Sequence, residues 1–231
     1  MKKIQKLLAL AVLTSTTAFA SVVEVNFADG ATWNSAITGG AKLVGSSSAA
    51  ALNIGVNSTV SENLELSVGR ANLGKSEVVS ASKYIELAAS TQLNVTAAIA
   101  LDPIKMTGAA TINNAANAIT LDKLTGAGLA TLTGAGVVTL ADLSGNTGGV
   151  AGVNVAINAS TKFPAEDSVF TGIATVSAAP VAASHNLTFN QINASYSVGA
   201  NDFFAAGSTK VLKASKLVLG GNTWAAAVTA N

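Results

Sequence analysis

The chain has one histidine, His185, and no cysteine, so few kinds of nucleophilic catalysis are open to it. A Ser-His-Asp arrangement would have to use His185, and Ser184 is its neighbour in sequence. Adjacent residues of a β-strand point to opposite faces of the sheet, so we expect these two side chains not to pair. No Gly-x-Ser-x-Gly sequence, the usual setting of a hydrolase nucleophile, occurs. The prediction is that His185 is an exposed polar residue just before a strand that begins near Leu187.

Two closely spaced pairs of carboxylates, Glu62 with Glu65 and Glu166 with Asp167, could in principle act as acid and base. Glycosidases use two carboxylates that face each other across a cleft. Aromatic residues, which usually stack on sugars in such clefts, make up only 5% of the chain. Isolated aspartates such as Asp102 and Asp142 lie near turns, where this residue favours hydrogen bonds with nearby backbone amides. These patterns predict no catalytic site and no metal site, and a protein that is not an enzyme.

The glycine clusters do not have the spacing of a phosphate-binding loop. Gly126-Ala127-Gly128 and Gly134-Ala135-Gly136 lack the third glycine of the dinucleotide fingerprint, and no Lys-Ser/Thr follows them. We therefore expect no cofactor and no small-molecule substrate.

The first 20 residues have the pattern of a secretory signal peptide. A lysine-rich start is followed by a short apolar run, and Ala18-Phe19-Ala20 supplies the small residues that signal peptidases read. The apolar run is too short to cross a bilayer as a helix. We expect cleavage after Ala20 and a mature protein, residues 21–231, that is secreted or held at the cell surface.

The mature chain carries little charge. Without residues 1–20 it has 10 basic and 12 acidic residues, and charged residues are 11% of the whole sequence. Soluble domains usually contain about 25% charged residues. Weak charge gives no sign of nucleic acid as a partner, and it lets copies of the same protein approach closely.

Apolar residues that alternate with polar ones, between glycine-containing turns, predict an all-β protein. The alternation is clearest in residues 21–27, where Val23, Val25 and Phe27 share one face. Other expected strands are residues 52–60, 63–68, 77–87, 92–101, 169–177, 186–192, 194–198, 210–219 and 223–229. The segment 77–90 also fits a short helix. We expect one β-rich domain over residues 21–231, with a subdivision, if there is one, near residues 146–167.

The middle third of the sequence repeats itself. Thr120–Gly126 recurs 19 residues later as Thr139–Gly145, with the similar segment Leu129–Gly136 between them. Short Thr/Leu strands between glycine turns fit either coils of a β-solenoid or hairpins. A solenoid needs at least about three repeats to bury a continuous core, and only two clear copies occur. The expected fold is therefore a β-sandwich with Greek-key or jelly-roll connections, and a solenoid segment in the middle third is the alternative.

In composition and strand style the mature chain resembles bacterial surface-layer, biofilm-fibre and adhesin-type proteins. The resemblance implies a non-enzymatic structural subunit, associated with the cell envelope, that assembles with copies of itself into a filament or surface layer. Assembly would proceed by β-augmentation, in which Ser21–Phe27 completes the unpaired sheet edge of the next copy with Val23, Val25 and Phe27 as plugs. Trp33 and Trp224 could anchor such an interface, although large aromatic residues are more often core residues.

Two other functions fit parts of the sequence. The length allows an outer-membrane β-barrel, but aromatic girdles are missing and the last residue, Asn231, is not aromatic. A secreted carbohydrate-binding or adhesive module would need exposed aromatic platforms, of which the chain offers Trp33, Tyr84, Tyr196 and Trp224. A cysteine-free fibre could also be cross-linked by Lys–Asn isopeptide bonds, for which lysines lie in or beside expected strands: Lys42, Lys83 and Lys123.

Overall fold

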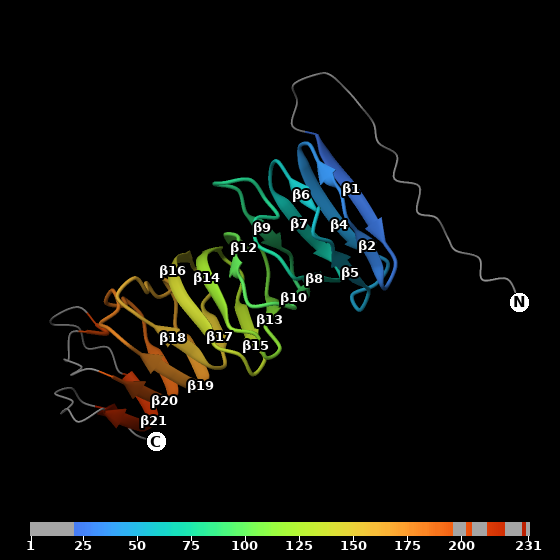
Figure 1. Cartoon of the computed structure of the whole chain (residues 1–231). Coiled ribbons are helices and arrows are strands. Elements are labelled where there is room, and N and C mark those ends of the chain that lie inside the picture. Colours follow the sequence, from blue (N-terminus) through green and yellow to red (C-terminus); the bar gives the residue numbers. More distant parts are fainter. Residues whose placement is uncertain (1–20, 196–201, 205–211, 220–227, 230–231) are drawn as a thin grey trace, which may run out of the picture.

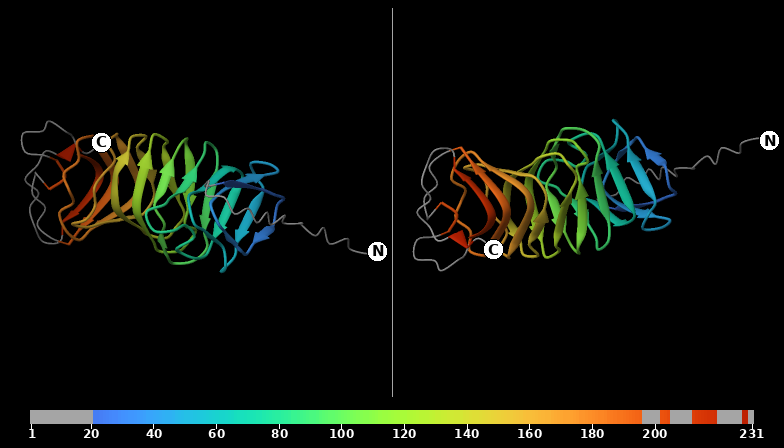
Figure 2. Two further views of the ribbon diagram at one scale, coloured as in Figure 1. Left: turned by 90° about the horizontal axis from the view of Figure 1, so that it is seen from above. Right: turned by 90° about the horizontal axis from the view of Figure 1, so that it is seen from below.

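The computed structural model describes residues 21–195, 202–204, 212–219 and 228–229, and these residues form 22 β-strands and no helix. The strands wind into a β-solenoid of about 9 turns. Every pairing between the named strands is parallel, because each turn returns to the same side of the molecule in the same direction. The coils stack from β1 at one end to β21 at the other (Figures 1 and 2).

Three sheets run along the stack, and each coil contributes a short strand to them in turn. The first sheet contains β1 (Val22–Phe27), β4 (Gly40–Gly45), β7 (Leu64–Val68), β9 (Ile85–Leu87), β12 (Ile104–Met106) and the C-terminal halves of β14 (Ile119–Gly126) and β16 (Val138–Asn146). The second sheet contains β2 (Ala31–Trp33), β5 (Ala51–Ile54), β8 (Arg70–Leu73), β10 (Gln92–Val95), β13 (Ala110–Asn113), β15 (Ala130–Thr133), β17 (Val150–Gly152), the N-terminal halves of β19 (Ser168–Val176), β20 (Leu187–Ala194) and β21 (Leu212–Leu219), and β22 (Val228–Thr229). The third side of the coil is interrupted. β3 (Ala36–Ile37) and β6 (Thr59–Val60) form a separate two-stranded sheet, which an isolated bridge from Val60 to Val79 extends. Farther along the stack, the third sheet contains β11 (Ala100–Leu101), β18 (Val155–Ile157), the N-terminal halves of β14 and β16, and the C-terminal halves of β19, β20 and β21.

The prediction of an all-β protein is confirmed, and the prediction of a β-sandwich is wrong. A sandwich of hairpins needs antiparallel neighbours, whereas β14 and β16, which carry the repeated Thr120–Gly126 and Thr139–Gly145 segments, pair in parallel. Thr120 lies opposite Thr139, and Leu121 lies opposite Leu140. The repeat is therefore one full coil, and the solenoid, expected only for the middle third, is the main arrangement of the described chain.

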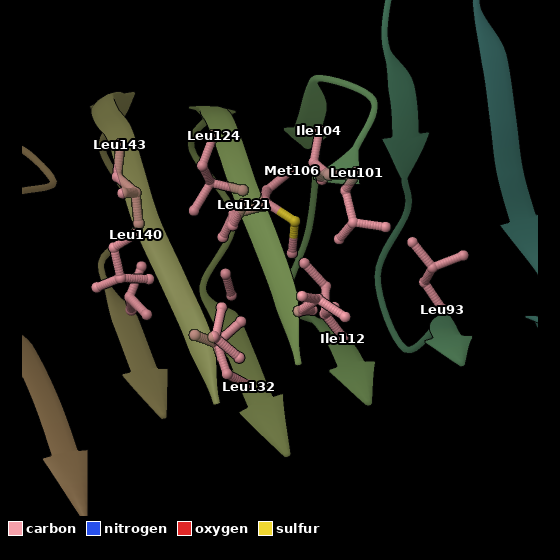
Figure 3. Close-up of a cluster of buried hydrophobic side chains, with 14 of the residues drawn as sticks. Leu93, Leu101, Ile104, Met106, Ile112, Leu121, Leu124, Leu132, Leu140 and Leu143 are labelled. Carbon is pink, nitrogen blue, oxygen red and sulfur yellow. The ribbon is translucent and has the colours of Figure 1, made fainter. Parts of the chain in front are cut away.

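The core consists of columns of inward-facing side chains, one residue per coil. In the first sheet the column is Leu43, Leu66, Leu87 and Met106, all buried. Figure 3 shows the same arrangement in the middle coils, where leucine, isoleucine and methionine side chains from all three sheets meet inside the coil. In a strand, alternate residues point to one face, so each short strand supplies one or two side chains to this core. Burial of these columns removes a continuous apolar surface from water along the whole stack.

Aromatic side chains fill the core toward both ends of the stack. In the last coils Phe170 and Phe189 lie one above the other, with ring centroids 5.0 Å apart and an interplanar angle of 14°. In the first coil Phe27 and Trp33 are buried, and the Trp33 indole donates a hydrogen bond to Ser35 Oγ at 3.1 Å. Large rings at the ends close a core that is otherwise made of aliphatic residues.

The local predictions have mixed outcomes. Strands at residues 22–27 and 64–68 are where alternation predicts them. Residues 77–90 contain the strand β9 and no helix. Strands on both sides of residues 146–167 belong to one stack and one core. The predicted signal peptide, Trp224 and Tyr196 lie outside the described residues.

Candidate functional site

The outer face of the first sheet carries a row of charged side chains. Glu24, Lys42, Glu65, Glu86 and Lys105 occupy the same outward position in successive coils. Lys42 Nζ lies 4.0 Å from Glu65 Oε1, and Lys105 Nζ lies 3.2 Å from Glu86 Oε2. The hydrogen bond to Glu86 raises the pKa of Lys105 above its usual value. Glu65 and Glu86 lie side by side in adjacent coils. Each is paired with a lysine of the next coil outward, Glu65 with Lys42 and Glu86 with Lys105.

The outer face of the second sheet carries a ladder of asparagines, Asn53, Asn72, Asn94 and Asn113. They lie opposite one another in successive coils. From Asn72 onward, each Nδ2 donates to the Oδ1 of the preceding asparagine, with distances of 2.8, 2.8 and 3.3 Å along the ladder. Gln92 Nε2 also donates to Asn94 Oδ1, at 2.5 Å. Strand spacing of about 4.8 Å suits a stacked amide, which can both donate and accept, so the ladder ties four coils together.

Corner carboxylates also tie coils together. Asp102 Oδ2 accepts hydrogen bonds from the backbone amides of Val78 at 2.7 Å and Val79 at 3.3 Å. Asp29 Oδ1 accepts from the Ala51 amide at 3.0 Å, and Asp167 Oδ1 accepts from the Asn186 amide at 2.9 Å. These carboxylates satisfy amides of a neighbouring coil, in the same way as the aspartates of turns satisfy local amides.

A polar hollow lies on the second sheet beside the asparagine ladder. Its volume is about 310 Å³. The hollow is lined by one outward-facing column of side chains from successive coils, Arg70, Gln92, Thr111 and Thr131. Ser90, in the turn before β10, also lines it. None of the residues that line it is acidic. This hollow offers hydrogen-bond donors and acceptors and one guanidinium group.

The residues predicted to mediate assembly lie in the first coil. β1 pairs with β4 through one edge, and Val25 and Phe27 point into the core of their own molecule, while Val23 is half-buried. Trp33 is also buried, at 5% exposure. In the described residues no strand pairs with the other edge of β1.

The predicted separation of Ser184 and His185 is wrong. Ser184 Oγ lies 2.8 Å from His185 Nδ1, because both residues lie in a bend before β20 and not in a strand, so alternation does not apply to them. Ser184 is exposed and His185 is half-buried. The residue after His185, Asn186, is bonded to a carboxylate. Its backbone amide donates to Asp167 Oδ1 at 2.9 Å, and its side-chain Nδ2 donates to Asp167 Oδ2 at 3.1 Å.

Glu62 and Glu65, one of the two carboxylate pairs noted in the sequence, each have a lysine partner of their own. Glu62 pairs with Lys83, and Glu65 pairs with Lys42, so two of the lysines considered for isopeptide bonds form ion pairs. Lys123 lies opposite Asp142 in the first sheet. Asp142 is bonded to Ser144 Oγ at 2.6 Å and to Lys162 Nζ at 2.9 Å, and these contacts lower its pKa to about 2.

Reasoning from the sequence missed both the asparagine ladder and the hollow. The ladder residues are separated by 19, 22 and 19 residues. A search for asparagines at intervals near the 19-residue repeat, with a tolerance of a few residues, would have found them. The hollow has no such signal, because it depends on which side chains the coils bring together.

Within the described ranges, no helix has the length and apolarity needed to cross a membrane, and no group of three or more His, Cys, Asp or Glu side chains could hold a metal ion. Comparison of the chain with protein-family models, curated proteins and solved structures gives no match.

Proposed function

We propose that the chain is a non-enzymatic structural subunit that works outside the cell and joins copies of itself end to end into a filament. The observation that carries the proposal is the outer edge of β1, the first rung of the stack, with which no strand of the described residues pairs. An open strand edge presents a row of amides and carbonyls that a strand of another molecule can complete.

The direction of the hydrogen bonds identifies the groups at this edge. The carbonyl oxygens of Ser21 and Phe27 accept from amides of the second coil, at 3.2 and 2.9 Å. In a parallel pair, alternate residues of a strand bond to opposite sides. The amides and carbonyls of Val22, Glu24 and Asn26 therefore face away from β4, toward the position of a further coil.

The end of one molecule can act as template for the other end of the next. The last described strand, β22, pairs in parallel with β21 in the second sheet, where β2 is the first strand of the stack. Strands at the two ends of the stack therefore run in the same sense, so that stacking of β22 on β2 of the next copy would bring its β1 edge into the same contact. Contact between unlike ends is heterologous and does not close, so it propagates as a filament. The core columns and sheets would continue from one copy to the next, which is edge-to-edge stacking and not insertion of a donated strand.

Three features of the chain support a structural role at the cell exterior. Residues 1–20 have the pattern of a secretory signal. Low charge weakens repulsion between copies. The asparagine ladder and the corner aspartates bind one coil to the next through polar groups.

The test is electron microscopy of residues 21–231 after dilution from denaturant, with Asn26→Pro and Asn26→Ala variants. Proline at position 26 removes an amide from the open edge and places its ring there, but it leaves the β1–β4 hydrogen bonds intact. Alanine keeps the amide and removes only the exposed side chain. We expect filaments from the parent chain and from Asn26→Ala, and dispersed, folded molecules from Asn26→Pro.

Two results would contradict the proposal in different ways. A parent chain that stays monomeric at high concentration would rule out self-assembly. Filaments of Asn26→Pro equal in number and length to those of the parent would show that assembly uses a surface other than the β1 edge. Far-UV circular dichroism of each variant verifies that the solenoid itself is folded.

A further inference from the structure

We propose that the hollow beside Arg70 binds an anionic oligosaccharide, with the guanidinium on its carboxylate or sulfate group and the neighbouring column of polar side chains on its hydroxyl groups. This proposal is independent of end-to-end assembly, because the hollow lies on the outer face of the second sheet and not at the end of the stack.

Arg70 has no carboxylate partner in the described part of the structure. It is the only arginine of the chain, and it is exposed. By contrast, Lys42, Lys83, Lys105 and Lys162 each lie against a carboxylate. The planar guanidinium presents donors in a fork that matches the two oxygens of a carboxylate or sulfate group. A lone arginine among uncharged residues is suited to an external anion.

A row of uncharged polar side chains lies next to the arginine. Gln92, Thr111 and Thr131 follow Arg70 at the same outward position, one per coil. Successive coils lie about 4.8 Å apart, so the row offers a regular series of hydroxyl and amide groups. The bond from Gln92 Nε2 to Asn94 fixes the orientation of the Gln92 amide. A small inorganic anion would use only Arg70, whereas a chain with many hydroxyl groups could use the whole row.

The hollow lacks the groups that nucleic acid needs. Binding of nucleic acid depends on several cations that contact successive phosphates and on aromatic side chains that stack on bases. Arg70 is the only charged residue that lines the hollow, and none of the lining residues is aromatic. The lack of aromatic residues also sets the hollow apart from the stacking platforms expected of a module that binds neutral sugars. An acidic saccharide would be held here by its anionic group on Arg70 and by hydrogen bonds to its hydroxyl groups, and not by ring stacking.

The solitary arginine makes a direct test practical. In a ¹H–¹⁵N spectrum of residues 21–231, the Nε–Hε signal can come only from Arg70. We would add, in separate titrations, a uronic acid hexamer, a sulfated hexasaccharide, a neutral glucose hexamer and inorganic sulfate. If the chain polymerises at the concentration used, the Asn26→Pro variant serves as the background.

We expect the Arg70 Nε–Hε signal and the amides of Thr111 and Thr131 to shift with one or both anionic hexamers, and not with the neutral one. Whichever hexamer binds identifies the anion as carboxylate or sulfate. Arg70→Gln should weaken binding about tenfold, equivalent to about 1.4 kcal/mol. Arg70→Lys should recover only part of the affinity, because ammonium lacks the fork.

Lys123→Gln is the matched control, since it removes one positive charge from the first sheet, on another face of the molecule. It should leave the affinity unchanged. An equal loss in Arg70→Gln and Lys123→Gln would mean that net charge alone attracts the saccharide, and would overturn the proposal. Equal affinity for inorganic sulfate and for the anionic hexamers would overturn the role of the row, and no shift with any hexamer would overturn the site.

Discussion

Substitution of two glycines with nearly the same backbone conformation can distinguish two causes of destabilisation: backbone strain at a corner, and close contact between adjacent coils. Gly30 and Gly149 both lie at the corner that precedes a strand of the second sheet, with φ of 73° and 77°. A Cβ at position 30 would meet no heavy atom within 4 Å. A Cβ at position 149 would lie 2.6 Å from the backbone carbonyl oxygen of Asp167 in the next coil.

The expected costs follow from these two environments. Alanine in a left-handed conformation costs about 1–2 kcal/mol, and loss of the freedom of glycine in the unfolded chain offsets about 0.4–1 kcal/mol of this. We therefore expect Gly30→Ala to lower the free energy of unfolding by roughly 0–1.6 kcal/mol. Gly149→Ala carries the same strain, and it must also push apart two backbones, which adds about 1–3 kcal/mol. The predicted difference between the variants is this second contribution.

The assay is urea unfolding of both variants and the parent, followed by far-UV circular dichroism. Because Gly30 lies in the first coil, which could unfold separately, Trp33 fluorescence in the same coil is followed in parallel. A Trp224→Phe background leaves Trp33 as the only tryptophan. Equal destabilisation of Gly30→Ala and Gly149→Ala on both probes would refute the reasoning that close contact between coils, and not backbone conformation alone, requires glycine at position 149.

Two further predictions concern the polar contacts between coils. Asn94→Ala removes hydrogen bonds on both sides of a half-buried amide, so it should lower the free energy of unfolding in urea by about 1–3 kcal/mol. The effect should be larger than that of Asn53→Ala at the end of the ladder. Equal effects of the two variants would argue against a cooperative ladder. Asp142 has a pKa lowered from 3.8 to about 2 by Ser144 and Lys162, so its contribution is complete above pH 3.8 and is lost as the pH falls through 2. Asp142→Asn should therefore be less stable than the parent at pH 6, and this difference should shrink as the pH falls through 2 and vanish near pH 1. A difference in stability that is as large near pH 1 as at pH 6 would be inconsistent with this titration.

The sequence predicts which residues of a strand face inward better than it predicts which strand lies beside it. Val25 and Phe27 alternate with polar residues in a pattern that indicates one buried face, and both are buried. The same pattern fits a hairpin and a solenoid, since both bury alternate residues. Only the direction of pairing separates them, and it depends on contacts between residues that are about 20 positions apart.

The length of the solenoid is hidden in the sequence because its coils are unequal. The asparagine ladder advances by 19, 22 and 19 residues, so insertions at corners break the period that a repeat search needs. Thr120–Gly126 and Thr139–Gly145 are the longest clear pair of segments that keep both spacing and residue type. Corners are similarly difficult to predict, as Ser184 and His185 show, because strand alternation says nothing about side chains in a bend.

The pairing of residues 19 positions apart in β14 and β16 also defines a unit of length for the molecule. Thr120 lies directly opposite Thr139, so a segment of 19 residues begins and ends at the same point of the coil. Removal or duplication of such a segment would leave each remaining residue on its own sheet and change the rod by one strand spacing, about 4.8 Å. Slippage or duplication within the gene could therefore lengthen or shorten the protein in uniform steps, with both end surfaces kept as they are.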